Sequence, residues 1–190
     1  MVIAGCRHKF EASSPHCIIN KNGLNSIVDL EIIETIDSSW RVFPNYGLMA
    51  ELRKASLLNH SDEKIFQYDF VEGVSFSDRE ILVGIHRTAH HLHILDANSF
   101  EIVQRLFIPV FCSFLFAESW NTSKGGFLIV YAALRGTSNL SILYVLDENF
   151  ELIYRECFSR ADALAVGYLE GFGDILGVRS RINNVKYFYW

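Results

Sequence analysis

One short sequence pattern occurs twice in this chain and limits the folds that it can adopt. Residues 92–102 read LHILDANSFEI, and residues 143–153 read LYVLDENFELI. In both, an apolar segment runs into Leu-Asp, a polar turn follows, and Phe-Glu leads into a second apolar segment. An apolar segment that begins with an acidic residue and Ile-Leu also recurs, at residues 80–87 and 174–181. Repetition of this kind is typical of stacked or radial β architectures.

The recurring pattern belongs to longer cycles of apolar segments that are separated by turn residues, which predicts β-strands. The predicted strands are 65–77, 80–87, 91–95 and 101–108, then 113–119, 127–135, 140–146 and 151–158, then 163–169, 174–179 and 185–190. The residues expected in the core are Ile81, Val83, Leu128, Val130, Leu143, Val145, Leu152 and Ile175. Residues 65–190 are therefore expected to form an all-β fold of antiparallel four-strand repeat units.

The first 64 residues are less regular. Residues 26–36 and 40–43 are predicted strands, and residues 46–59 favour a short helix because Leu48, Leu52 and Ala55 lie on one face. A strand pair is the alternative for that segment. No linker or low-complexity tract interrupts residues 1–190, so we expect a single domain.

Four-strand units with an acidic residue after the third strand resemble the blades of a β-propeller of the WD40 or YVTN type. The resemblance covers residues 65–190 and is carried by Leu95-Asp96 and Leu146-Asp147. The chain lacks the Gly-His and Trp-Asp pairs of WD40 repeats, and three units fall short of the usual four to eight. An N-terminal strand, a degenerate fourth blade or oligomerisation would complete such a ring. The alternative fold is a β-sandwich or a stack of antiparallel sheets.

Composition restricts the function classes. The formal net charge of −5 argues against a general nucleic-acid binder. The apolar run at residues 106–116 is interrupted by Pro109 and is too short to span a membrane, so we expect no membrane association. The four cysteines form no CxxC pair, which favours a reducing, cytoplasmic compartment over a disulfide framework.

The sequence contains no motif that points to catalysis. It has no GxSxG, Walker A or GxGxxG pattern, so we assign no catalytic residue and no cofactor. The densest polar cluster is His86, His90, His91 and His93. Alternate residues of a strand share a face, so His91 and His93 should point the same way, and His86 could approach across the hairpin. One hypothesis is a metal site or a small enzyme centred on this hairpin. We favour the other, a solvated hairpin tip that binds no metal.

Charged residues divide between the two ends of the predicted repeats. When the second strands of the three cycles are aligned, Arg87, Arg135 and Arg181 fall at equivalent places where that strand ends. The turns at the opposite end carry Asp78, Glu80, Asp96, Asp147, Glu148 and Asp174, together with Arg79. The arginines would offer bidentate recognition of carboxylates. The alternative is that each pairs with a neighbouring acidic residue or caps a backbone carbonyl.

These observations favour a non-enzymatic protein–protein interaction module, an adaptor or a complex subunit, that holds a basic partner on its acidic end. Its predicted binding residues are Asp96, Asp147, Glu148, Asp174, Arg87, Arg135 and Arg181. A toxin-neutralising immunity protein is an alternative with the same size and acidity. Self-association into a homo-oligomer, or a subunit that completes its sheet with a strand from a partner, is a further alternative.

Overall fold

The fold is described by a computed structural model that covers residues 19–20, 24–28, 41–42, 67–87, 91–108, 112–134, 140–159, 161–169, 173–180 and 185–189. Over these residues the regular structure is β-strand, no α-helix occurs, and every strand pair is antiparallel. The predicted all-β, antiparallel character is therefore confirmed. The predicted helix at 46–59 lies outside the described residues.

Consecutive strands build three sheets. The first sheet contains β4 (Tyr68–Phe76), β5 (Arg79–His86), β6 (His91–Asp96) and β7 (Ile102–Phe107) in that order. The second contains β8 (Cys112–Thr122), β9 (Gly125–Leu134), β10 (Leu140–Leu146) and β11 (Leu152–Ser159). The third contains β12 (Ala161–Leu169), β13 (Gly173–Ser180) and β14 (Val185–Tyr189). The three predicted cycles of strands are thus the three sheets.

Short strands from the N-terminal part of the chain extend two of these sheets. β1 (Ile19–Asn20) pairs with β11, and β3 (Arg41–Val42) pairs with β12. β2 (Asn25–Val28) pairs with β14 and supplies a fourth strand on that side of the third sheet. One way of completing the third unit that the sequence suggested, an added N-terminal strand, is therefore present, although the described residues do not close a ring.

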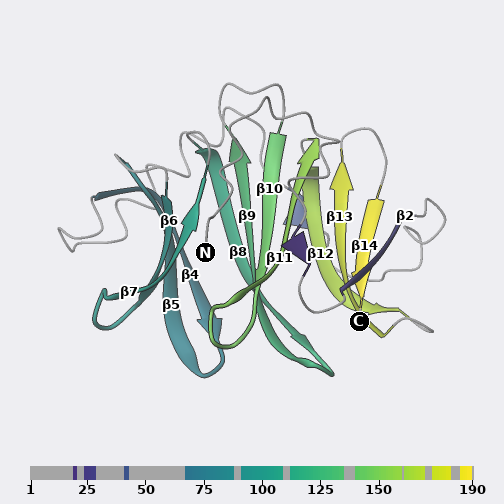
Figure 1. Cartoon of the computed structure of the whole chain (residues 1–190), viewed down its shortest axis with the longest axis horizontal. Coiled ribbons are helices and arrows are strands. Elements are labelled where there is room, and N and C mark those ends of the chain that lie inside the picture. Colours follow the sequence, from purple (N-terminus) through teal and green to yellow (C-terminus); the bar gives the residue numbers. More distant parts are fainter. Residues whose placement is uncertain are drawn as a thin grey trace.

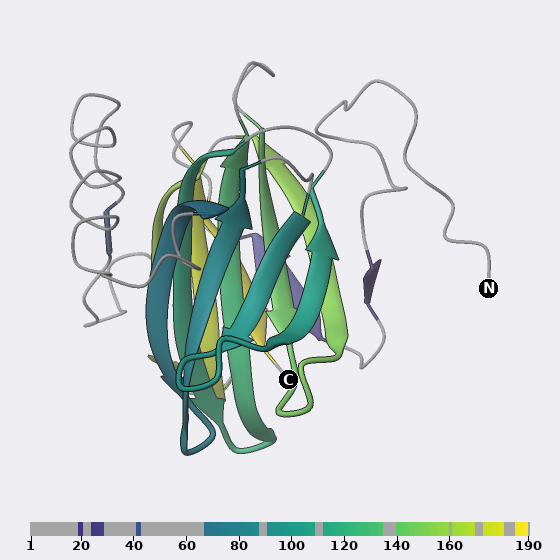
Figure 2. The same ribbon diagram turned by 90° about the vertical axis from the view of Figure 1, so that its left-hand side faces the viewer.

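The sheets lie side by side as an open fan, with the second sheet in the middle (Figure 1). Figure 2 turns the molecule so that the first sheet faces the viewer, with its outer face in front. Side-chain hydrogen bonds also join the first sheet to the second. The Tyr144 hydroxyl donates to the Phe107 carbonyl over 2.8 Å, and the Gln104 amide donates to the Phe150 carbonyl over 2.8 Å.

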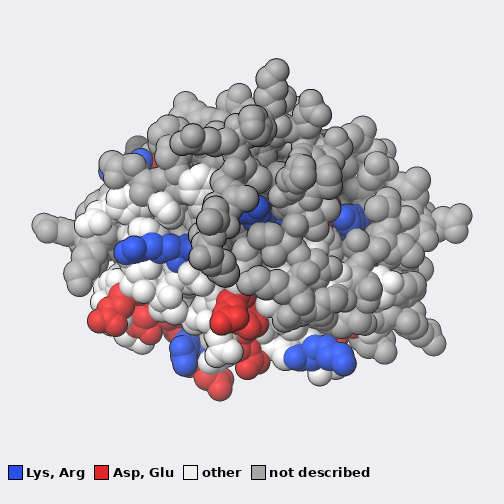
Figure 3. Space-filling model, in the orientation of Figure 1, with Lys and Arg blue, Asp and Glu red and all other residues white. Residues whose placement is uncertain are grey.

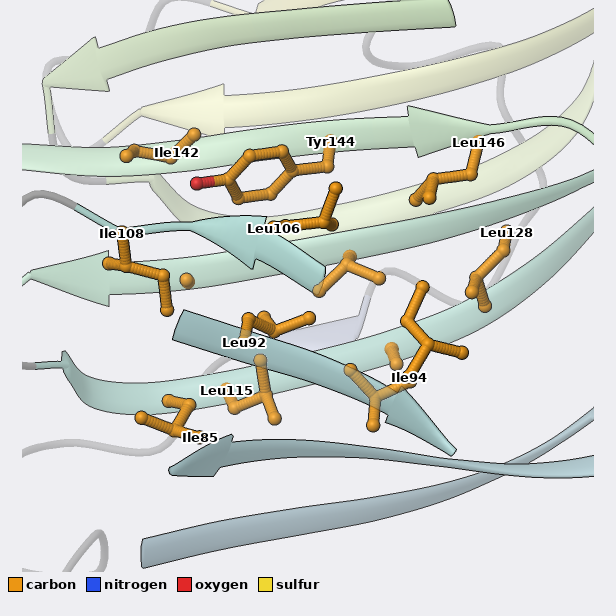
Figure 4. Packing of buried hydrophobic residues seen from close by; sticks show 14 of the residues in the cluster. Ile85, Leu92, Ile94, Leu106, Ile108, Leu115, Leu128, Ile142, Tyr144 and Leu146 are labelled. Atoms are coloured by element: carbon orange, nitrogen blue, oxygen red, sulfur yellow. The ribbon is translucent and has the colours of Figure 1, made fainter. Parts of the chain in front are cut away.

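Because the second sheet is covered on both faces, its central strands are apolar along their whole length rather than alternating with polar residues. One face, which includes Leu128 and Val130, packs against the first sheet, and the packing is drawn in Figure 4. The other face, which includes Ile129 and Tyr131, packs against the third sheet.

The predicted core residues are buried with one exception. Ile81, Val83, Leu128, Val130, Leu143, Val145 and Ile175 are each at most 1 % exposed. Leu152 is only half-buried, so its prediction was wrong. It is the first residue of β11 and lies where the β10–β11 register shifts, which leaves it at the margin of the core rather than inside it.

Candidate functional site

In the first two sheets, the turns after the first and third strands lie at one end of the molecule, and Asp174 at the start of β13 contacts one of them. Acidic side chains gather there along the lower edge of Figure 3, interrupted by a few basic ones. The carboxylates in or beside these turns belong to Asp78, Glu80, Asp96, Glu101, Asp147, Glu148, Glu151 and Asp174, and the basic side chains among them to Arg79 and Lys124. We call this set the acidic end.

Asp96 holds the turn between β6 and β7. Its Oδ1 accepts the backbone N–H groups of Asn98 and Ser99 at 2.9 and 2.8 Å, and the hydroxyl of Ser99 at 3.2 Å. Hydrogen bonds from the N–H groups of Ser99 and Asn98 favour the ionised form, so the pKa of Asp96 lies below its usual value. The negative charge at this turn is therefore fixed in position.

Asp147 also binds backbone N–H groups of its own turn, between β10 and β11. Its Oδ1 accepts the N–H groups of Asn149 and Glu151, each at 2.9 Å. Both turns end on a phenylalanine with a positive φ, 59° at Phe100 and 60° at Phe150. The repeated Leu-Asp…Phe-Glu pattern thus encodes two related turns that an aspartate caps, the first one residue longer than the second. The aspartates have a structural role that the sequence analysis did not assign to them.

Glu148 and Asp174 also bind backbone groups of a neighbouring turn. Oε1 of Glu148 accepts the N–H of Gly126 at 2.9 Å, and Oδ2 of Asp174 accepts the N–H of Ser123 at 2.9 Å. The second bond links the third sheet to the β8–β9 turn of the second. A hollow of about 510 Å³ opens among these turns; its lining residues are Lys124, Gly125, Gly126, Phe127, Asp147, Glu148 and Asn149.

Of the three predicted arginines, Arg87 alone lies within the described residues; Arg135 and Arg181 lie outside them. Nε of Arg87 is 3.4 Å from Oδ1 of Asp69 and donates to the Tyr68 carbonyl over 3.4 Å. This arginine therefore has the neighbouring acidic partner that the sequence analysis gave as its alternative explanation. The predicted alignment of all three on one rim stays a prediction.

The histidines of the β5–β6 hairpin come together as their spacing predicted, apart from His90, which lies outside the described residues. The His93 ring centroid lies 5.4 Å from that of His86 and 6.3 Å from that of His91. The sequence gave no sign of a further member, Tyr68, whose hydroxyl lies 2.9 Å from Nδ1 of His93. These side chains form the histidine cluster.

Burial and nearby positive charge both favour the neutral form of His93, the central residue of this cluster. His93 is 7 % exposed, and its pKa falls to about 4 because burial disfavours the cation and because His86, Arg105 and His91 add repulsion. Among the described residues, no group of histidine, cysteine, aspartate or glutamate side chains has an arrangement that could hold a metal ion.

Comparison with known proteins does not assign this chain to a family. No family model, no curated protein and no solved structure matches the chain. The part of the chain that the structure describes contains no helix of the length and apolarity needed to cross a membrane.

Proposed function

We propose that this protein is a non-enzymatic interaction module that binds a basic protein partner through its acidic end. The observation that carries the proposal is the gathering of carboxylates from three sheets at one end of the fan (Figure 3). Such a surface attracts a cationic partner at long range and selects against an acidic one. We also propose that the three sheets are propeller-like blades, whose loop ends are the surface through which such a module works.

Rigidity of the acidic turns supports this proposal. Asp96, Asp147 and Glu148 each accept at least one backbone N–H, so their charges are held in place before any partner arrives. A preorganised surface loses less conformational entropy on binding than a flexible one. The hollow between Lys124–Phe127 and Asp147–Asn149 gives a lysine or arginine side chain a place to enter beside the carboxylates of Asp147 and Glu148.

The test separates the charge of the acidic end from its structural role. In the triple variant Asp96→Asn, Asp147→Asn and Glu148→Gln, each amide oxygen can still accept the turn N–H, but the negative charges are gone. The tagged wild-type chain is used to capture partners from its own cells, and their identity is established by mass spectrometry. Affinity of the purified partner is then measured for both forms between low and physiological salt.

We expect a basic partner whose affinity falls with salt and falls further in the triple variant, while the melting temperature stays close to that of the wild type. Arg87→Gln, which changes a charge at the other end, is the matched control and should leave affinity nearly unchanged. Equal affinity of the triple variant and the wild type would rule out the acidic end as the binding surface.

A further inference from the structure

Exposed apolar side chains concentrate on one strand. Among the described residues, the large hydrophobic side chains that stay exposed are Ile102, Val103 and Phe107, at 39, 43 and 51 %. All three belong to β7, the outer strand of the first sheet. Single exposed hydrophobic residues are ordinary on a protein surface, but a group on one element is a mark of an interaction surface.

The backbone of β7 is poorly suited to pairing with another strand. Opposite β6, Gln104 pairs with Ile94 and Ile102 with Leu95, so Val103 is an extra residue that forms a bulge. A bulge interrupts the regular row of N–H and C=O groups that an added strand needs, and proteins use it to protect sheet edges. A partner would therefore contact the side chains of β7 rather than form backbone hydrogen bonds with its edge.

Those side chains lie on the outer face of the first sheet. In the register of β6 and β7, Ile102, Arg105 and Phe107 stand opposite Leu95, His93 and His91. The other face of the same strands is buried against the second sheet. The outer face thus carries a row of apolar and cationic residues that ends on the histidine cluster, and we call this row with its hollow the outer face site.

A hollow of about 280 Å³ lies in this face. It is mainly apolar, and its lining residues are Gln67, Tyr68, Val71, Leu82, Leu95, Phe100 and Ile102. Tyr68 forms part of its wall and joins it to the histidine cluster through the contact with His93. The hollow has room for one aliphatic or aromatic side chain of a partner.

A positively charged side chain, Arg105, stands opposite His93 on the same face as the hollow. Arg105 is exposed, and its guanidinium has no carboxylate partner among the described residues. Arg105, His86 and His91 each contribute to the lowered pKa of His93, which shows that they act on one shared space. Asp69, one of the two acidic residues on β4, is already paired with Arg87. A carboxylate is the group that would complement Arg105, because its two oxygens match the guanidinium fork.

We propose that the outer face site docks a segment of a protein partner in which a carboxylate lies next to a large apolar side chain. The carboxylate binds Arg105, and the apolar side chain enters the hollow beside Ile102 or packs on Phe107. This site adjoins the acidic end, because Asp96 and Glu101 lie next to the lining residues Leu95 and Ile102. It is additional to the function proposed for that end, because it is an apolar hollow beside the Arg105 guanidinium and takes a partner of opposite charge.

The test uses three fluorescein-labelled peptides of equal length: one alternates glutamate and leucine, one lysine and leucine, and one glutamate and serine. Fluorescence anisotropy gives their affinities, and amide chemical shifts locate the contact. We expect the glutamate–leucine peptide to bind at least about tenfold more tightly than the other two, with shifts at Tyr68, His93, Arg105 and Phe107. The lysine peptide loses a charged hydrogen-bonded contact and the serine peptide loses a buried apolar side chain, and each loss is worth about this factor.

Variants at exposed positions keep the test free of folding defects. Arg105→Gln and Phe107→Ser should each weaken the glutamate–leucine peptide about tenfold, and Arg105→Lys should lie between, because it keeps the charge and loses the fork. Arg79→Gln, at the acidic end, is the control and should change nothing. Equal binding of the lysine peptide, or unchanged affinity in both test variants, overturns the proposal. So does self-association of the wild type that Phe107→Ser abolishes, because the occupant would then be a second copy of this chain.

Discussion

Replacing Asp147 with alanine should destabilise the protein through a single turn. Oδ1 of Asp147 accepts two backbone N–H groups at 2.9 Å, and alanine leaves both of them to water. A net contribution of about 0.5–1 kcal/mol for each exposed bond gives a loss of about 1–2 kcal/mol. The same turn places Phe150, 3 % exposed, against Phe76 at a ring distance of 5.6 Å, so its loosening reaches the core.

The Asp147→Asn variant distinguishes the hydrogen bonds that the side-chain oxygen accepts from the negative charge of the carboxylate. Because its side-chain oxygen can occupy the position of Oδ1, Asp147→Asn should lose less than about 0.5 kcal/mol. Urea unfolding followed by circular dichroism measures both variants, and the alanine variant should also melt about 2–8 °C lower. If asparagine costs as much as alanine, the charge and not the capping bonds stabilises the turn, and the repeated aspartate does not act as a hydrogen-bonding cap.

Three further variants test other parts of the structure. Gly84→Ala would place a Cβ 2.7 Å from Cδ1 of Tyr68, so it should cost about 1–3 kcal/mol in urea unfolding, and less when Tyr68→Ala has already removed the ring. His93 has a pKa lowered from 6.5 to about 4, so its contribution to stability is complete above pH 6.5 and is lost as the pH falls toward 4; His93→Gln should flatten the stability profile in this window, and an unchanged profile would contradict the assignment. Leu128→Ala, at 0 % exposure between the first two sheets, should cost about 2–5 kcal/mol, and a near-neutral result in chemical denaturation would mean that this packing is misplaced.

Much of the strand order could be predicted from the sequence, because local patterns determine it. Turn residues such as Ser77-Asp78 end one apolar run and begin the next, and the sheets are built from runs in chain order. The short N-terminal strands were harder. β1 is two residues long and has no periodicity of its own; it becomes a strand because the edge of β11 is available.

The candidate site was predicted less completely than the fold. The aspartates at 96 and 147 were predicted as contact residues, whereas both bind the backbone of their own turn, as Asp in a turn often does. The approach of His86 to His93 followed from the predicted hairpin, which brings the two strands side by side. The participation of Tyr68 did not, because its contact with His93 spans 25 residues and depends on how β4 pairs with β5.

The pairing of β2 with β14 determines the order in which the molecule can be completed during synthesis. Residues 25–28 leave the ribosome early, but their partner strand, residues 185–189, is made about 160 residues later. At about 5–20 residues per second this interval lasts about 10–30 s. The hairpins of the first and second sheets can form within it, because their strands are neighbours in the chain. The third sheet gains its β2 strand last, so the emergence of residues 185–189 from the ribosome is the event on which completion of this sheet depends.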